Sequence, residues 1–480
     1  MTDKESDSLI VPWKPGNASG GKGRTYKPLC GAKHLAHRRC GKMENAFRRI
    51  ALQAEKHSQV QTLMHYVNKE TLADEHRRQK KGKATGADSI DKEKYGEELD
   101  ANLEQLLSDM KAFRYRPQAV RRTYIPKTGS DKLRPLGIPS YEDRLVQGVM
   151  RRVLDQIYEG KFYDFSYGFR ESKSCHQAII EVQRIVMSRK VNFVVDADIR
   201  GFFDNVNHEW LLKFLEHDIG DRNFLRYVSR FLKAGIIEEM CFYESDKGTP
   251  QGGLISPVLA NVYLHYALDM WFEKKVKKWC RGEAHIVRYA DDFVCFFQHK
   301  NEAEGFFKAL KERLQKFGLE LAEEKSKVIK FGRFARVDSA DGKTESFDFL
   351  GFTHINGQTK AGKYRLDHRT SRKKLEAKKQ AVKEWLRENI HGKASDTIVL
   401  LNRKLIGHYR YYGISGNQKG LLSFYRFIVQ AFYIVLTRRS QRTYLTWKRY
   451  RSLLRKHPVL EPKIYVNLWQ YKDCMKSPMP

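Results

Sequence analysis

The sequence predicts an α+β protein with a separate basic region, and three observations support this. The chain has 480 residues, 41% of them hydrophobic and 12% aromatic, which suits about three cored domains and argues against global disorder. Between residues 190 and 360, the clearest β-favouring runs alternate with helical patterns, which is typical of α+β domains. After residue 360 the composition becomes strongly basic.

The net charge indicates a polyanionic partner. The chain carries 89 Lys+Arg against 57 Asp+Glu, a formal charge of +32. So much positive charge in a compact chain is self-repelling unless a polyanion neutralises it. Nucleic acid is therefore the leading partner, and a role in small-molecule metabolism is disfavoured. Seven scattered Cys imply no disulfide framework. The polar N-terminus lacks the basic segment followed by an apolar segment that is typical of a signal peptide. We expect a soluble cytoplasmic protein in a reducing compartment, with an organelle matrix left open and no membrane partner.

Residues 1–45 are expected to form a flexible basic leader, because they are rich in Gly, Lys and Ser. The leader contains four candidate zinc ligands within eleven residues, namely Cys30, His34, His37 and Cys40. Two arginines lie inside this group, so a basic RNA-contacting segment is favoured over a zinc site.

Residues 46–190 are expected to mix helices with short strands. Apolar residues at three-to-four spacing predict helices near residues 47–67, and a basic, glycine-containing loop follows at residues 80–89. A strand is predicted at residues 122–126. Lys127 and Arg134 flank a turn just beyond it, where two cations on a β-ribbon could bind a triphosphate.

Residues 191–360 contain the acidic residues that suggest chemistry. In the strand around residues 192–199, alternation places Asp196 and Asp198 on the face opposite Phe193 and Val195. We interpret Asp196 as a solvent-facing strand residue and Asp198 as a functional one.

Two further carboxylates lie at the centre of residues 286–297, where β-favouring runs flank Asp291 and Asp292. This pattern predicts a hairpin with the acidic pair at its turn. Asp-Asp is also simply a good turn dipeptide. With Asp198 on a similar strand, however, the three acids could hold two Mg²⁺ ions, the arrangement used for in-line phosphoryl transfer.

Between these strands, residues 247–272 predict a glycine turn and a buried helix. Ser256 and Pro257 are typical of an N-cap and first turn, and an apolar face follows at Leu259, Val262, Tyr266 and Met270. Gly252 and Gly253 leave backbone that a nucleotide could approach. An ordinary turn before a helix explains the glycines but not Gln251 beside them.

The last quarter of the chain predicts a nucleic-acid-binding surface. Residues 361–480 hold 27 Lys+Arg and 7 Asp+Glu, a net +20. Residues 371–389 read as a helix with a narrow apolar stripe and many lysines, among them Lys373, Lys374 and Lys378. Most charge runs are solvated helix faces. Here, however, the cations are interleaved with tyrosines and tryptophans, as expected of a surface that binds RNA or single-stranded nucleic acid.

Five motifs occurring together give the chain a resemblance to the reverse transcriptases encoded by group II introns, also called maturases. They are LRPLGIP (133–139), SYGFR (166–170), ADIRGFFD (197–204), PQGGLISPVLANVYL (250–264) and YADD (289–292). Residues 401–417 resemble the maturase-specific thumb signature. The family implies a right-hand polymerase with fingers at 46–190, an antiparallel palm at 191–360, an α-helical thumb at 361–440 and a basic tail at 441–480.

The resemblance also implies residue roles. Asp198, Asp291 and Asp292 would be the catalytic Mg²⁺ ligands, and Phe203 would be the steric gate that selects dNTPs. Lys127, Arg134 and Gln251 would contact the incoming nucleotide, although the turn between the first two is about a residue longer than usual. The proposed nucleic-acid contacts are Phe349, Leu350, Gly351, Lys373, Lys374, Lys378, Arg403, Lys404 and Arg410. Lys325 is a further candidate, as a leaving-group acid.

The expected function is RNA-directed DNA synthesis from a primer, together with binding of the parent intron RNA during splicing and mobility. A DNA target and a homodimer are compatible with the family. Clustered Cys and His ligands are not found in residues 361–480, so no HNH endonuclease is expected. Two alternatives stay open, a polymerase recruited to another role such as phage defence and a non-catalytic splicing cofactor.

Overall fold

The computed structural model describes residues 45–126, 133–238, 241–244, 246–249, 252–335, 344–439 and 445–468. The leader with Cys30, His34, His37 and Cys40 lies outside these residues. Lys127 and Gln251 also lie outside them.

The N-terminal region is mostly helical and carries a small sheet. Residues 45–56 are helical, and the predicted basic loop at 80–89 is confirmed as a loop. The helices that follow are η1 (Met64–Tyr66), α2 (Lys69–Arg78), α3 (Lys92–Glu97), α4 (Leu99–Lys111), α5 (Tyr141–Tyr158), α6 (Cys175–Ser188), α7 (Phe202–Asn205), α8 (His208–Asp218) and α9 (Arg222–Leu232).

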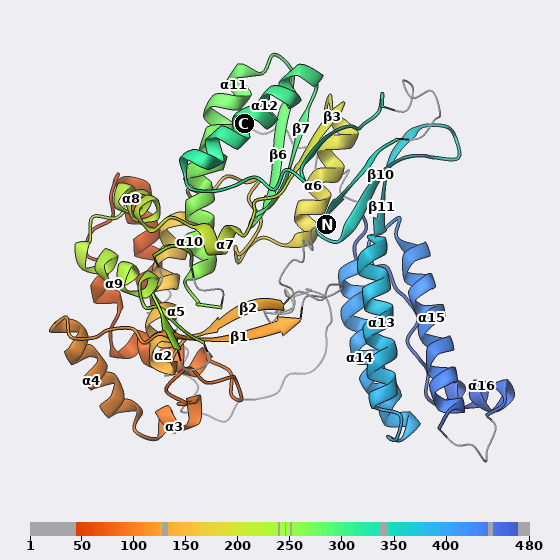
Figure 1. The fold of residues 1–480 in the computed structure, drawn as a ribbon, viewed down its shortest axis with the longest axis horizontal. Coiled ribbons are helices and arrows are strands. Elements are labelled where there is room, and N and C mark those ends of the chain that lie inside the picture. Colours follow the sequence, from red (N-terminus) through yellow and green to blue (C-terminus); the bar gives the residue numbers. More distant parts are fainter. Residues whose placement is uncertain are drawn as a thin grey trace, which may run out of the picture.

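The predicted strand at 122–126 is confirmed as part of a β-ribbon. Strand β1 (Val120–Pro126) pairs antiparallel with β2 (Leu133–Ile138), and β4 (Ile236–Glu238) and β5 (Cys241–Tyr243) complete the sheet in the order β2-β1-β4-β5. In Figure 1 this ribbon points from the N-terminal helices toward the C-terminal helices.

The central sheet has the order β6-β7-β3-β8, and its neighbouring strands are all antiparallel. Its strands are β3 (Phe193–Ala197), β6 (Ala284–Tyr289), β7 (Asp292–Phe297) and β8 (Lys327–Lys330). Helix α12 (Lys300–Lys316) packs with one face, and α6 packs with the other.

Burial of both faces corrects one expectation. Asp196 was expected to face solvent, but only 6% of it is exposed. Its face of β3 also carries Val194, which packs with residues of α6 and of the strands after residue 345. Alternation identified the face correctly, but the layer that covers it comes from distant parts of the sequence.

The helix after the glycine turn changes character along its length. It runs as α10 (Ser256–Leu264), then through the π-helical segments η2 (His265–Asp269) and η3 (Phe272–Val276), into α11 (Lys277–Trp279). The N-cap is Ile255, one residue before the expected Ser256. The predicted apolar face is buried at Leu259 and Val262 but only half-buried at Tyr266, because π turns hold more residues than α turns and shift the buried face.

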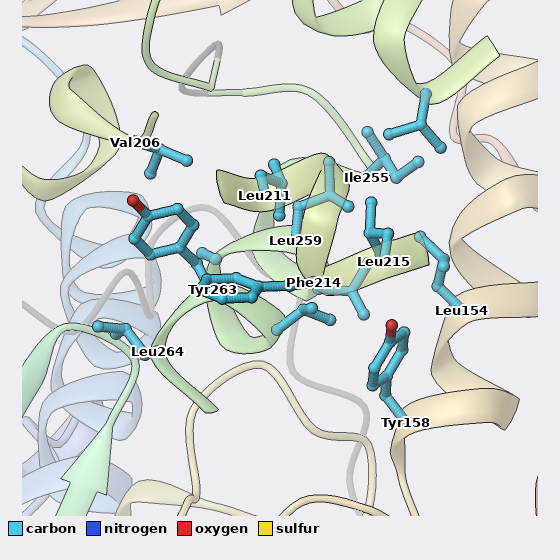
Figure 2. Close-up of a cluster of buried hydrophobic side chains, with 14 of the residues drawn as sticks. Leu154, Tyr158, Val206, Leu211, Phe214, Leu215, Ile255, Leu259, Tyr263 and Leu264 are labelled. Carbon is cyan, nitrogen blue, oxygen red and sulfur yellow. The ribbon is translucent and has the colours of Figure 1, made fainter. Parts of the chain in front are cut away.

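The first core lies where α10 meets α5 and α8. Figure 2 shows Leu259 and Tyr263 of α10 beside Phe214 and Leu215 of α8, with Tyr158 of α5 close by. These five residues are at most 8% exposed. This packing fixes α10 under the central sheet.

A second sheet and a helical bundle form the C-terminal part. The sheet has the order β11-β10-β9, with β9 (Ser346–Phe349), β10 (Phe352–Gln358) and β11 (Tyr364–Thr370). The predicted helix at 371–389 is confirmed as α13 (Arg372–Glu388). The others are α14 (Ala394–Tyr412), α15 (Gln418–Thr437) and α16 (Trp447–Lys456). In Figure 1, α13, α14 and α15 lie side by side below the β10–β11 hairpin.

Helix α15 is long and mostly apolar. Among the described residues it is the one helix whose length and hydropathy would allow it to cross a membrane, with a mean hydropathy of 1.5. Its inner side packs in the core of the bundle through Leu421, Phe424 and Ile428. A core helix passes the same test, so the feature is weak evidence for a membrane span.

Candidate active site at one edge of the central sheet

The three predicted acidic residues meet at one edge of the central sheet. The register pairs Ala197 with Phe293 and Tyr289 with Asp292. Asp198 follows Ala197 directly, so it continues β3 beside Asp292 on the neighbouring strand, at a strand spacing of about 5 Å. The hairpin turn is Ala290-Asp291, with Ala290 in the left-handed region at φ 56°.

Asp198 has a basic neighbour. The Nζ atom of Lys325 lies 3.6 Å from its Oδ2 atom, and the two side chains are 28% and 17% exposed. The backbone N–H of Asp198 donates to Oγ of Ser326 at 3.1 Å. The lysine singled out in the sequence therefore reaches the candidate site, where its ammonium group partly balances the charge of Asp198.

The carboxylates share this edge but do not form a compact ligand group. Within the described ranges, no three His, Cys, Asp or Glu side chains lie close enough to hold a metal ion. Both carboxylate oxygens of Asp292 are buried. Carboxylate oxygens on adjacent strands are nevertheless the kind of ligand that suits Mg²⁺.

Phe203 and Phe202 have different environments. Phe202 is 2% exposed and fills the core, whereas Phe203 is half-buried beside it. The ring of Phe203 lies edge-on to Phe169 of the SYGFR segment, with centroids 6.4 Å apart. Its carbonyl oxygen accepts a hydrogen bond from the N–H of Thr249 at 2.8 Å. Phe203 is therefore not a fully buried core aromatic.

The glycine turn packs against the β-ribbon. Gly252 has φ +116°, and a Cβ atom there would lie 2.2 Å from the carbonyl oxygen of Gly137 in β2. The lack of a side chain at Gly252 thus serves contact with the protein's own strand. That contact brings the turn beside the strand that carries Arg134, which is half-buried and pairs with Ile125 of β1.

A second segment is docked onto the YADD hairpin. The N–H of Tyr167 donates to the carbonyl oxygen of Arg288 at 2.8 Å, and the N–H of Arg288 donates to that of Phe165 at 2.9 Å. A Cβ atom on Gly168 would lie 2.2 Å from the backbone nitrogen of Ala290. The SYGFR segment is therefore packed directly against the turn.

The sequence reasoning missed the buried group beneath this turn. Arg288 and Asp269 form an ion pair in which both side chains are 0% exposed, and Asn261 contacts the same guanidinium group. A charged residue within the apolar run IVRY was the available signal. Its partner could not be read from the sequence.

The proposed nucleic-acid contacts differ in accessibility. Phe349 and Leu350 are at most 1% exposed, because they close the β9–β10 turn inside the second core, so their side chains face the protein interior. Gly351 follows in the same turn at φ 75°. The ammonium group of Lys374 is buried, and those of Lys373 and Lys378 belong to half-buried side chains. The exposed members are Arg403, Lys404 and Arg410.

Comparison with known proteins agrees with this arrangement. Residues 125–354, which include all three carboxylates, match the model of the family described as reverse transcriptase (RNA-dependent DNA polymerase). This part of the chain is therefore similar to a reverse transcriptase domain. Such a domain implies a right-hand polymerase fold, and the mixture of helices and antiparallel sheet in this chain is consistent with it.

The relatives confirm the resemblance to group II intron proteins. The chain is 34% identical over 263 residues to the group II intron-encoded protein LtrA of Lactococcus lactis subsp. cremoris, covering 52% of this chain and 44% of LtrA. It is 34% identical to protein YkfC of Escherichia coli (strain K12), covering 44% of this chain and 62% of YkfC. A putative COX1/OXI3 intron 1 protein of Saccharomyces cerevisiae is 35% identical over 172 residues, covering 36% of this chain and 20% of that protein. The chain thus spans less than two thirds of the length of each of these relatives.

Proposed function

We propose that the protein is an RNA-directed DNA polymerase that extends a primer on an RNA template by two-Mg²⁺ nucleotidyl transfer. The observation that carries this proposal is the placement of Asp198 beside the Asp291-Asp292 hairpin, on one edge of a sheet within a reverse transcriptase domain. A non-catalytic splicing cofactor would not need three acids at this one edge of the sheet.

The side chains have distinct proposed roles. Asp198, Asp291 and Asp292 would hold two Mg²⁺ ions, which when bound supply activation of the primer 3′-hydroxyl and neutralisation of phosphate charge. Lys325, beside Asp198, is positioned to stabilise negative charge near the same edge.

Nucleotide selection is assigned to the ribbon and to α7. Arg134, with Lys127 and Gln251, would bind the dNTP triphosphate. The half-buried ring of Phe203 would pack under the sugar and exclude a 2′-hydroxyl. We assign fingers, palm, thumb and tail to residues 46–190, 191–360, 361–440 and 441–480. The helical bundle itself begins at Arg372, because β11 extends to Thr370.

The C-terminal bundle is proposed to bind group II intron RNA, which gives the protein a maturase role in splicing and mobility. A pocket of about 510 Å³ lies over α13 and α15, lined by Lys379, Lys419, Leu422, Ser423, Arg426, Phe427 and Gln430. Helix α15 contains no Asp or Glu. The Nζ atom of Lys379 lies 2.8 Å from Oε1 of Glu376 and 5.6 Å from the ring centroid of Phe427. Cations beside a half-exposed ring suit phosphates and bases of RNA.

Primer extension on an RNA template tests the proposal. Purified protein with a DNA primer, an RNA template, dNTPs and Mg²⁺ should extend the primer, and chelation of Mg²⁺ should stop it. A wild-type preparation that binds RNA but never extends would contradict the polymerase assignment. Retention of the parent intron RNA over an unrelated RNA of equal length would support the maturase role. Sedimentation would show whether a homodimer forms.

A further inference from the structure

The YADD hairpin rests on a buried charged group that the proposed mechanism does not use. The guanidinium group of Arg288 in β6 is 0% exposed. Its Nε atom donates to Oδ1 of Asp269 at 2.8 Å, and its Nη2 atom donates to Oδ2 at 2.5 Å. Two parallel hydrogen bonds of this kind fix the orientation of the guanidinium plane as well as its position. A buried ion pair is weak evidence for stability, so it invites another explanation.

The same guanidinium group holds the backbone of the turn. Its Nη1 atom donates to the carbonyl oxygen of Ala290 at 2.9 Å. That carbonyl belongs to the peptide bond whose nitrogen is Asp291. Ala290 adopts φ 56°, a strained conformation for a non-glycine residue that persists only when its surroundings hold it. Arg288 supplies such a restraint.

The partners of Arg288 come from the helix beneath the sheet. Asp269 ends the π-helical segment η2, and π segments often occur at functional sites. Oδ1 of Asn261, in α10, accepts from Nη1 of Arg288 at 3.0 Å. Nδ2 of Asn261 donates to the carbonyl oxygen of Gly168 at 2.7 Å. One network therefore joins α10, η2, the SYGFR segment and the hairpin turn.

We propose that Arg288 is a positioning residue for nucleotidyl transfer. Held by Asp269 and Asn261, it fixes the plane of the Ala290–Asp291 peptide and thereby the direction in which the Asp291 carboxylate leaves the hairpin. This inference rests on the proposed polymerase function. Reactive groups must be held to well under 1 Å, and a displacement of about 1 Å costs on the order of 100-fold in rate.

The test compares Arg288→Lys with a matched control, Arg313→Lys. Lysine keeps the positive charge but cannot donate the two parallel hydrogen bonds to Asp269. Arg313 of α12 binds the same π-helical segment, donating to the carbonyl oxygens of Ala267 at 2.8 Å and Tyr266 at 3.1 Å. The measurements are thermal unfolding, kcat and KM for dNTP, the Mg²⁺ dependence of extension, and Mn²⁺ binding followed by electron paramagnetic resonance.

Arg288→Lys should lower kcat about 100-fold and weaken metal binding about 10-fold, with KM for dNTP nearly unchanged. Arg313→Lys should leave kcat and metal binding close to those of the wild type. Equal losses in the two variants would overturn the proposal, because they would reflect general packing. So would a folded Arg288→Lys variant with normal kcat and Mn²⁺ affinity.

A milder variant covers the case in which Arg288→Lys does not fold. Asn261→Ala removes one acceptor and the link to Gly168, and it should lower kcat about 10-fold while the protein still unfolds cooperatively. Unchanged kcat and metal binding would refute the proposal. If the wild type showed no extension at all, the polymerase function would fail, and the Mn²⁺ affinities alone would decide the role of Arg288.

Discussion

Replacing Gly168 with alanine tests how closely the SYGFR segment and the YADD turn must fit. The added Cβ atom would lie 2.2 Å from the backbone nitrogen of Ala290 and 2.9 Å from its Cα atom. Ordinary contact begins at 3.4 Å, so the turn must withdraw by about 1 Å. The atoms in the way are backbone, which cannot rotate aside.

Two effects of different size follow. Overpacking of this kind costs about 1–3 kcal/mol of unfolding free energy. Because Asp291 and Asp292 lie in or beside the displaced turn, extension should slow by about 100-fold, more than the loss of stability alone would cause at a temperature where the variant stays folded.

The assay is single-turnover primer extension beside urea unfolding, with Gly160→Ala as the matched control. Gly160 lies shortly before the same segment, and a Cβ atom there would have no heavy atom within 4 Å. Gly160→Ala should match the wild type in both measurements. Normal extension by Gly168→Ala would refute the reasoning, since the turn could then move without consequence.

Four further predictions concern other residues. Asp291→Asn should abolish Mg²⁺-dependent extension while RNA affinity stays within a few-fold, and extension by a clean preparation would contradict the metal assignment. Phe203→Ala should admit rNTPs, as measured by the ratio of rNTP to dNTP incorporation. RNA binding should weaken steeply with salt, and Arg426→Glu should reduce the slope in a filter-binding titration. Burial lowers the pKa of His408 in the folded protein to about 3. As pH drops below about 6.5, the unfolded state therefore binds a proton at His408 that the folded state does not bind. The free energy of unfolding should fall over this range. His408→Phe should flatten this decline, as measured by urea unfolding at a series of pH values.

Local patterns predicted much of the chain correctly. The strand at 120–126, the helix from Arg372 to Glu388 and the hairpin that carries Asp291 and Asp292 all follow from hydrophobic periodicity and turn chemistry, which neighbouring residues determine. The turn of that hairpin is Ala290-Asp291, one residue before the predicted acidic pair, because Asp292 already pairs with Tyr289. The family motifs added the order of the acidic strands. Nothing in the sequence indicated that β11 pairs with β10 in a hairpin before the helical bundle begins at Arg372.

The composition by itself indicated a polyanionic partner, and the motifs gave the resemblance to reverse transcriptases and the three acids at the ends of two strands. Only the tertiary structure decided that Asp196 is buried, that Lys325 reaches Asp198, and that Arg288 pairs with Asp269. Each of these depends on which distant segment covers a given face of the sheet. Periodicity along one strand specifies that a face is apolar, but the partner that covers it is chosen by packing between elements far apart in the sequence.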